Sequence, residues 1–201
     1  MNKKVAMLFF LILFILGIAI GYTACPTKGE VVQRIDFIEF MSTTFSELQY
    51  STKPISGEII SDILAAGHMA GSSRNGQPWH FSVVRNREII DSILDNVTDE
   101  NVLIVISGPR EELNSRFSVN FDCGLAAQNM FLAAKSLGLG ARMYALPLPN
   151  INENLLPKLE LPNEDYRAVI VLRIGHPLQD NVAVSNASPR QPLLNKVSFI
   201  D

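Results

Sequence analysis

The sequence predicts one domain that combines helices and strands, of the α+β or α/β sandwich class. The chain has 201 residues, of which 47% are hydrophobic and 18% are charged, so it is long enough and apolar enough to bury a core. Segments with helical spacing of apolar residues alternate with short apolar runs, in the order ααβαβαβαβ. This composition excludes a mainly disordered chain, a collagen-like rod and a disulfide-stapled miniprotein.

Two amphipathic helices are predicted before the first strand. Apolar residues recur at near-helical spacing over residues 32–41 and again over residues 55–69. Ser56 is the expected N-cap of the second helix, because its hydroxyl can accept a hydrogen bond from an amide of the first turn. A glycine, Gly67 or Gly71, is the expected stop. The expected buried side of this helix consists of Ile59, Ile60, Ile63 and Leu64.

Short apolar runs further along the chain predict the strands of a sheet. The first strand is expected at residues 79–84, and a short helix at 87–94 separates it from the next. Residues 102–106 are all β-branched or Leu, which is typical of a strand covered on both faces. The later elements are expected to be a strand at 141–145, a short helix at 152–159, a strand at 168–174 and an extended arm over 175–201.

The longest predicted helix covers residues 117–137. A helix that is apolar all round is buried, so this one is expected in the interior, with Cys123 as a small packing residue. Gly138 and Gly140 are expected to end it. Its small residues, which lie on more than one side, are Gly124, Ala126, Ala127, Ala133 and Ala134.

An apolar run over residues 5–22 follows Lys3 and Lys4 at the start of the chain. As a helix, the run would rise about 27 Å, which reaches across a hydrocarbon core. Residues 1–25 are therefore predicted to be a signal peptide or an uncleaved membrane anchor. Either one places the following domain on the extracytoplasmic side.

Residues 22–25, at the end of this segment, are compatible with more than one kind of processing. Tyr22-Thr23-Ala24-Cys25 resembles a bacterial lipoprotein cleavage box, except that Tyr22 stands where Leu is usual. Lipidation of Cys25, simple cleavage and a retained anchor are all compatible with it. Residues 26–30 are the expected linker to a domain over 31–201 that ends in the arm.

Charge and motifs exclude several classes of function. The net charge is −3, and the chain after residue 25 carries 15 basic and 20 acidic side chains, so no basic stripe is available for nucleic acid. His68, His80 and His176 have no Cys or carboxylate at ligand spacing, and no metal site is expected. The chain has no Gly-x-Ser-x-Gly elbow, no P-loop and no Gly-x-Gly-x-x-Gly fingerprint.

A polar loop before the first strand carries the most chemistry. Ser72-Ser73-Arg74-Asn75-Gly76-Gln77-Pro78-Trp79 brings hydroxyl, amide and guanidinium groups together, and Gly76 frees the backbone. Such groups can bond several edges of a heteroaromatic ring, because amides both donate and accept. Trp79 is expected to close the end of the sheet beneath the loop. On its chemistry alone, the segment is better explained as a capped turn with an anchoring Trp.

Further segments favour a ligand-binding loop over a capped turn, because they occur together and in the order found in one protein family. The loop is preceded by Ala65-Ala66 and followed by His80-Phe81. The later segments are Asp122-Cys123-Gly124-Leu125-Ala126-Ala127-Gln128-Asn129, Leu137-Gly138-Leu139-Gly140, Ile174-Gly175-His176-Pro177 and Pro189-Arg190-Gln191-Pro192-Leu193. Over residues 38–195 the chain thus resembles the nitroreductase-like family of FMN flavoproteins.

The resemblance implies a fold and an activity. The fold is an α+β three-layer sandwich with a central mixed sheet and a long buried helix. Two copies would form a homodimer that exchanges arms and holds FMN at its interface. The implied enzyme is an NAD(P)H-type FMN oxidoreductase, which passes hydride through the flavin to nitro, quinone or similar small acceptors. The flavin carries this chemistry, so no catalytic side chain is implied.

The resemblance also assigns cofactor contacts. The implied cofactor-binding residues are Ser46, Ser72, Ser73, Asn75, Gln77, Leu139, Gly140 and Arg190. Gln77 should lie near the pyrimidine side of the flavin, and the backbone at Leu139 and Gly140 near the ring edge. Arg190 should meet the phosphate.

One motif of the family is damaged in this chain. Members usually carry Arg-x-Ser-x-Arg before an aromatic residue and Pro-Val; residues 50–55 fit the later positions, and Ser46 fits the serine. Thr44 and Phe45 replace the first arginine and Leu48 the second. Because the arginines clamp the FMN phosphate, and each charge-assisted bond contributes about 1.5–3 kcal/mol, weaker FMN binding is expected.

Two functions from different classes follow. The first is the enzyme, in which Arg190, Arg74 or Lys53 could compensate at the phosphate. A membrane donor could supply its electrons, because an exported domain meets little NAD(P)H. The second is a flavin-less nitroreductase-like scaffold that acts as an exported binding or interaction module. Phe45 and Leu48 at arginine positions, together with the export signal, motivate this alternative.

Overall fold

The computed structural model describes residues 34–110, 118–178 and 190–200, so the predicted segments 1–25 and 26–30 lie outside the described residues. Two compact units divide the chain, Met1–Ser42 and Thr43–Asp201. The elements are α2 (Arg34–Thr43), α3 (Gly57–His68), the 3₁₀ turn η1 (Ser73–Asn75), β1 (His80–Val84), α4 (Arg87–Ile93), β2 (Val102–Pro109), α5 (Val119–Ser136), β3 (Gly140–Tyr144), α6 (Leu148–Asn150), the helical turns η2 (Ile151–Leu155) and η3 (Leu156–Leu159), β4 (Tyr166–Gly175) and η4 (Leu193–Lys196).

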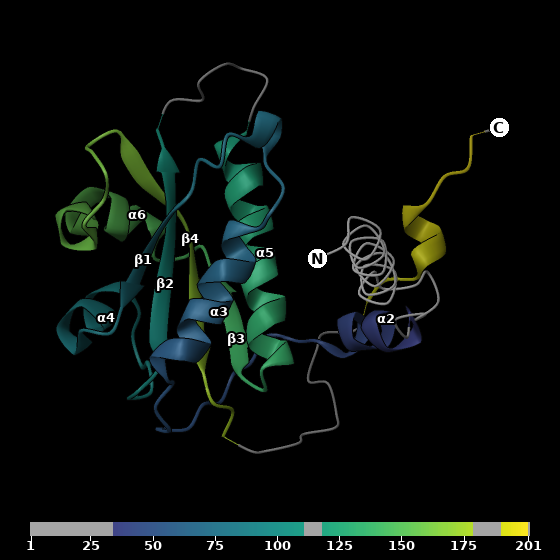
Figure 1. Ribbon diagram of the computed structural model, residues 1–201, viewed down its shortest axis with the longest axis horizontal. Coiled ribbons are helices and arrows are strands. Elements are labelled where there is room, and N and C mark those ends of the chain that lie inside the picture. Colours follow the sequence, from purple (N-terminus) through teal and green to yellow (C-terminus); the bar gives the residue numbers. More distant parts are fainter. Residues whose placement is uncertain (1–33, 111–117, 179–189, 201) are drawn as a thin grey trace, which may run out of the picture. The chain divides into compact units, whose positions relative to one another are not determined.

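The described strands form a four-stranded sheet in the order β1-β2-β4-β3 (Figure 1). All neighbouring pairs are antiparallel: Ile104 of β2, for example, pairs with Val83 of β1 and with Leu172 of β4. The expected mixed sheet is thus corrected to an antiparallel one over these strands. The crossover through α5 does leave β2 and β3 pointing the same way, but β4 inserts between them and runs opposite to both.

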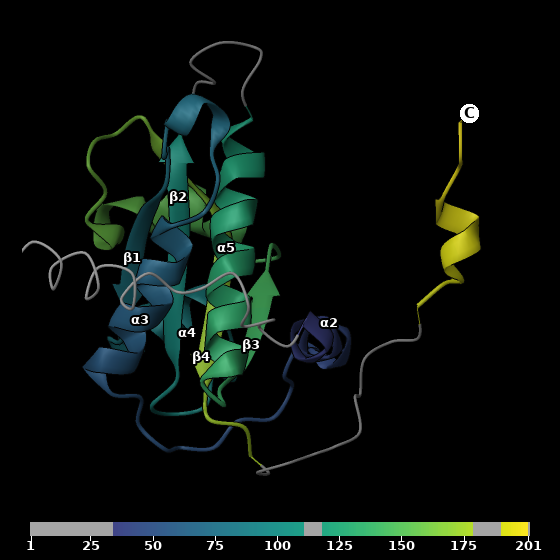
Figure 2. The same cartoon turned by 45° about the vertical axis from the view of Figure 1, so that its right-hand side comes forward.

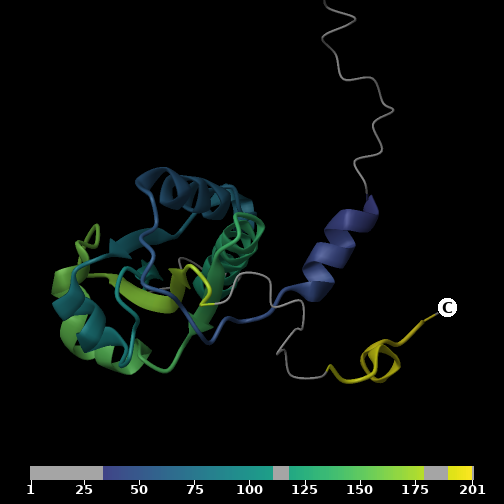
Figure 3. The same cartoon turned by 90° about the horizontal axis from the view of Figure 1, so that it is seen from below.

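Strand β2 is buried on both faces, as its β-branched composition predicts, and it separates two hydrophobic cores. Successive side chains of a strand point to opposite sides. Ile104 and Ile106 join the core beneath α3 and α5, whereas Leu103 and Val105 join the core beneath α4 and the turns from α6 to η3. Helices therefore cover both faces of the sheet, which confirms the α+β three-layer sandwich (Figure 3).

Helices α3 and α5 lie side by side on one face of the sheet (Figure 2). Helix α3 begins where predicted, because the Ser56 Oγ accepts a hydrogen bond from the Ile59 amide at 3.3 Å. Its expected buried side is confirmed at Ile60 and Ile63. Trp79 is buried in the same core, just before β1, and its ring stacks on Phe81 at 6.3 Å between centroids. The Trp thus anchors the polar loop to the core.

Helix α5 is not buried all round, contrary to the prediction. Cys123, Ala126 and Ala127 are fully buried against the first core, and Cys123 is the small packing residue expected. On the outer face, however, Phe121 is 65% exposed and Leu125 is 37% exposed. The small residues let the sheet approach one face, while the larger apolar side chains lie one turn apart on the other. Exposed apolar residues in this arrangement are typical of a surface that a partner covers.

The two ends of the described chain each contain one helical element, α2 and η4. Helix α2 confirms the first predicted helix, but its apolar side chains are exposed: Phe37, Ile38 and Met41. The predicted arm over 175–201 is described in two parts. Gly175 still belongs to β4 and Pro177 forms an isolated bridge with Tyr50, so the arm starts later than predicted, and residues 190–200 contain the short turn η4. Among the residues that the structure describes, no helix is long and apolar enough to span a bilayer.

Candidate functional site

The polar loop over residues 72–77 is held in a defined shape by its own hydrogen bonds. The Ser72 Oγ accepts from the Gln77 amide at 3.0 Å, and the Gln77 Nε2 donates to the Asn75 Oδ1 at 3.0 Å. Arg74, Asn75 and Gln77 have φ angles of 51°, 58° and 44°, which non-glycine residues rarely adopt. Such backbone strain clusters at ligand sites. It favours a preformed binding loop over an ordinary capped turn.

Asp122 joins this loop to the first turn of α5. Its carboxylate is buried and accepts from the Ser73 amide at 3.2 and 3.3 Å. A negative charge is favourable in the first turn of a helix, where backbone amides are unpaired. The carboxylate therefore ties the loop to the first turn of α5.

A groove of about 490 Å³ lies between the loop and α5. Its lining residues are Ser72, Ser73, Ser118, Phe121, Asp122 and Leu125. The groove combines hydroxyl groups with the exposed apolar face of α5. Apolar surface with a few convergent polar groups is what a flat heteroaromatic ligand requires.

A second group of predicted site residues lies at the other end of α5: Ser46, Leu139 and Gly140. The Glu47 amide donates to the Ala141 carbonyl at 3.0 Å, which places residues 44–49 against the start of β3. A Cβ at Gly140 would lie 2.6 Å from the Glu47 Cγ, so glycine is needed for this approach. The serine and the glycine of the prediction are thereby brought into one region.

The two groups of predicted residues are not brought together within one chain. The polar loop lies at the first turn of α5, whereas Gly140 begins β3, which follows the other end of that helix (Figure 1). At 1.5 Å per residue, this helix is about 27 Å long. The amide of Leu139 already donates to the Ala134 carbonyl at 2.9 Å. Arg190 lies in the separate described segment, and its phosphate contact stays a prediction.

The charges in the second group differ from those of an arginine clamp. Leu48 is 58% exposed and Phe45 is half-buried, and neither brings a charge. The Glu47 Oε1 accepts from the amides of Leu48 and Gln49 at 3.0 and 3.1 Å. The Lys135 ammonium lies 4.5 Å from the centre of the Phe45 ring. Burial lowers the pKa of Lys135, and the negative charge of Glu47 opposes that shift.

Three residues of these groups were missed by sequence reasoning: Glu47, Asp122 and Lys135. Asp122 stands in one of the quoted motifs, and an acidic residue at a helix start was the available signal for its role. Glu47 and Lys135 are far apart in the sequence. Only the packing of residues 44–49 against the end of α5 and β3 brings them together, and no local pattern encodes that contact.

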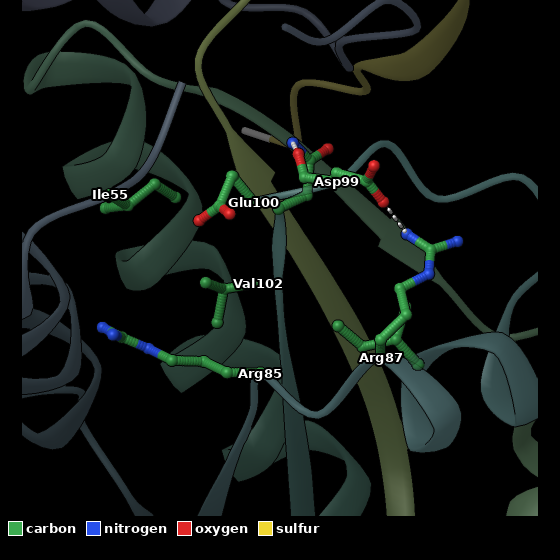
Figure 4. Close-up of a pocket in the computed structure, with 8 residues that line it drawn as sticks. Ile55, Arg85, Arg87, Asp99, Glu100 and Val102 are labelled. Atoms are coloured by element: carbon green, nitrogen blue, oxygen red, sulfur yellow. Dashed lines mark hydrogen bonds and ion pairs between the residues drawn. The ribbon is translucent and has the colours of Figure 1, made fainter. Parts of the chain in front are cut away.

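A second cavity, of about 240 Å³, lies at the end of β1 opposite to the polar loop (Figure 4). Arg87 donates to the Asp99 Oδ1 at 3.0 Å and to the Val97 carbonyl at 2.6 Å, and it also pairs with Asp91. Arg85 points away from this cluster, as Figure 4 shows. Because the Arg87 charge is compensated by the chain itself, we interpret this cluster as structural. None of the predicted site residues lines the cavity.

Known proteins share this sequence pattern. A family model described as Nitroreductase family matches residues 45–102 and 92–176. A protein of Methanothermobacter thermautotrophicus, named "Putative NADH dehydrogenase/NAD(P)H nitroreductase", is 33% identical over 157 residues. The alignment covers 74% of this chain and 81% of the relative.

Known structures share the fold. A crystal structure from Parabacteroides distasonis, under the same name, has a TM-score of 0.68 and 27% identity. It covers 82% of this chain and 97% of its own. A structure from Desulfovibrio desulfuricans, described as "a putative nitroreductase in complex with fmn", has a TM-score of 0.68 and 26% identity over 82% of this chain and 96% of its own.

Proposed function

Because this chain belongs to the nitroreductase family, we propose that it is an FMN-dependent oxidoreductase. It would take hydride from NAD(P)H or a membrane donor and pass the electrons to nitro compounds, quinones or similar small acceptors. The name of the Methanothermobacter relative and the FMN in the Desulfovibrio structure support this proposal. The observation that carries it is the strained polar loop beside an open groove with an apolar helix face.

The loop end of the site fits the ring of FMN. The isoalloxazine edge both donates and accepts hydrogen bonds, and the hydroxyls of Ser72 and Ser73 with the amides of Asn75 and Gln77 supply both functions. Phe121 and Leu125 offer apolar surface beside them. The task of these residues is to hold the ring in one orientation and to exclude water from one of its faces.

The residues predicted near the phosphate fit FMN less well than the loop fits its ring. Ser46 offers an exposed hydroxyl, and Lys135 offers one positive charge near Phe45. Glu47 adds a negative charge that opposes a phosphate. We therefore expect FMN to bind mainly through its ring, with Arg190 as an additional proposed phosphate contact.

A homodimer completes this site. The loop group and the residues 44–49 lie at opposite ends of α5, so one flavin cannot touch both within one chain. A second copy packed antiparallel on the exposed face of α5 would bring its residues 44–49 to the loop of the first. Phe121 and Leu125 would then become buried.

Bound FMN would supply the redox chemistry, accepting hydride and passing it on. The chain would supply orientation through the loop, a dry apolar wall through α5 and charge at the phosphate. No side chain is assigned a proton transfer. Substrates would reach the ring from the groove side.

Visible absorption of the purified full-length chain tests this function. We expect flavin absorption near one FMN per chain, and FMN as the mass released on heating. NAD(P)H oxidation in the presence of a nitro compound or a quinone then measures the activity. A colourless chain that stays colourless after incubation with excess FMN would refute the proposal.

A binding module without flavin is the second candidate. The carboxylate of Glu47 on the amides of Leu48 and Gln49, and the uncharged Phe45 and Leu48, favour it. Tight FMN binding, with a Kd of about 1 μM or below, would exclude this alternative; that value corresponds to roughly −8 kcal/mol.

We also propose that the domain acts outside the cytoplasmic membrane, anchored or exported through residues 1–25. The apolar run after two lysines supports this. Cell fractionation of the full chain and of a Cys25→Ser variant tests it. Membrane association that is lost with Cys25 would indicate a lipid anchor, and a wholly cytoplasmic protein would contradict the proposal.

A further inference from the structure

We propose that residues 46–49 and Lys135 form an anion site that the Glu47 carboxylate fills in the free chain. The phosphate of a bound flavin nucleotide takes the place of this carboxylate. The inference rests on the proposed FMN function and adds to it a switch between an internal and an external anion.

The first support is the geometry of the backbone. Two successive amides, those of Leu48 and Gln49, converge on the Glu47 Oε1 at 3.0 and 3.1 Å. Successive N–H groups that point at one oxygen form a small anion-binding concavity. A phosphate oxygen has the same charge and size as the carboxylate oxygen that lies there, so it can accept the same two hydrogen bonds.

The second support is the charge of Lys135. Its ammonium lies over the Phe45 ring, 4.5 Å from the ring centre, and Glu47 is the negative group that acts on it. Thr44 and Phe45 together stand where the family resemblance places the first arginine. The aromatic ring therefore holds a cation from α5 in the region where that guanidinium is missing.

The third support is the mobility that the site permits. Glu47 is half-buried, and the exposed Ser46, Leu48 and Gln49 border it, so its carboxylate can turn out to solvent. The Glu47 stem rests on Gly140, where any Cβ would collide with the Cγ. Rotation at the end of the side chain vacates the two amides and leaves this backbone contact in place.

Three variants and one control test the inference. Glu47→Gln removes the charge but keeps an acceptor, Glu47→Ala vacates the amides, and Lys135→Gln removes the cation. Lys158→Gln, on the exposed turn η3 of the opposite layer, makes the same charge change as Lys135→Gln away from the site. Each full-length chain is freed of ligand, and its Kd for FMN and for riboflavin is measured by fluorescence.

Riboflavin lacks the phosphate, so the ratio of the two Kd values isolates the anion site. We expect Glu47→Ala to tighten FMN about tenfold, Glu47→Gln to tighten it less, and Lys135→Gln to weaken it about tenfold. Riboflavin binding and the Lys158→Gln control should be unchanged. A ratio that is the same in all five chains would overturn the inference, as would weaker FMN binding by Glu47→Ala.

A second readout separates this inference from the proposed function. Thermal unfolding is measured in inorganic phosphate and in chloride at equal ionic strength. Phosphate should raise the Tm of Glu47→Ala more than that of the wild type, and it should raise the Tm of Lys135→Gln least. If no chain binds either flavin, the proposed function fails, and this phosphate response alone decides the inference. Equal responses in every chain would then overturn it.

Discussion

At the scale of single residues, the proposed phosphate contact depends on the charges near the end of α5. Phe45 and Leu48 bring no charge, Glu47 brings a negative one and Lys135 a positive one. An isolated exposed charge contributes little, but a charge that is partly buried beside a ring contributes more. The ammonium of Lys135 is of the second kind, because burial already lowers its pKa.

Leu48→Arg should strengthen FMN binding. Leu48 is exposed, so the longer side chain can be accommodated, and a guanidinium pairs with phosphate through two hydrogen bonds. We expect the Kd for FMN to fall about tenfold and the Kd for riboflavin to stay constant. Titration by fluorescence measures both values. Leu48→Gln, with a neutral polar side chain, is the control, and an equal gain in that variant would contradict a phosphate contact.

Cys123 should make the fold sensitive to alkaline pH. Burial raises the pKa of its thiol from about 9 to about 12. The folded state therefore keeps a proton that the unfolded state loses. The stabilising contribution is complete below pH 9 and is lost as the pH rises toward 12.

The free energy of unfolding against pH, measured with urea, checks this dependence. Cys123→Ala should flatten the decline between pH 9 and pH 12. Some decline should persist in that variant, because burial also raises the pKa of Tyr50. An identical slope in both chains would show that the thiol does not titrate as described.

At the scale of elements, local patterns predicted most of the fold. The Ser56 cap, the doubly buried β2 and the positions of α3 and β4 follow from spacing and composition, which act over a few residues. The antiparallel order and the exposed face of α5 do not. They depend on where β4 inserts and on which side of α5 meets the sheet, and both are decided by contacts between distant parts of the chain.

The candidate site also has one part that local patterns predicted and one part that depends on long-range contacts. The polar loop could be found because its residues are contiguous, and the damaged arginine motif because it is a pattern. The contact of Glu47 with Gly140, and that of Lys135 with Phe45, depend on tertiary packing. Sequence reasoning therefore found the groups proposed to bind the ring but not the charged residues that lie near the predicted phosphate position.

Asp122→Ala should loosen the polar loop from α5. It would leave the partly buried Ser73 amide without its acceptor, which costs about 1 kcal/mol, the low end of the range for an unpaired donor. We expect that loss of stability in urea unfolding, together with weaker flavin binding. Asp122→Asn keeps one acceptor oxygen and should retain most of the stability. A fully stable Asp122→Ala chain would show that the loop holds its shape without this contact.

At the scale of the whole molecule, the two halves of the site lie at the two ends of one helix. The exposed Phe121 and Leu125 occupy the outer face of that helix. The proposed homodimer through this face would serve both features at once. It would bury apolar side chains, and it would bring unlike ends of two copies together.

Leu125→Asp should separate the two copies of the proposed homodimer. A carboxylate placed in that apolar contact would lose its hydration without a partner, which strongly opposes association. We expect light scattering to give the mass of one chain instead of two, and flavin to be lost in parallel. Leu125→Ala, which adds no charge, should remain dimeric. A Leu125→Asp chain that is monomeric and still binds FMN would contradict a shared site.

In the proposed homodimer, a loop at one end of α5 and a lysine at the other have a genetic consequence. A chain defective in its loop and a chain weakened at Lys135 would each form two impaired clefts when expressed alone. Mixed together, they would form hybrid pairs in which one cleft inherits both lesions and the other inherits none. Full affinity would return to half of the clefts in those pairs, so two impaired alleles would complement each other.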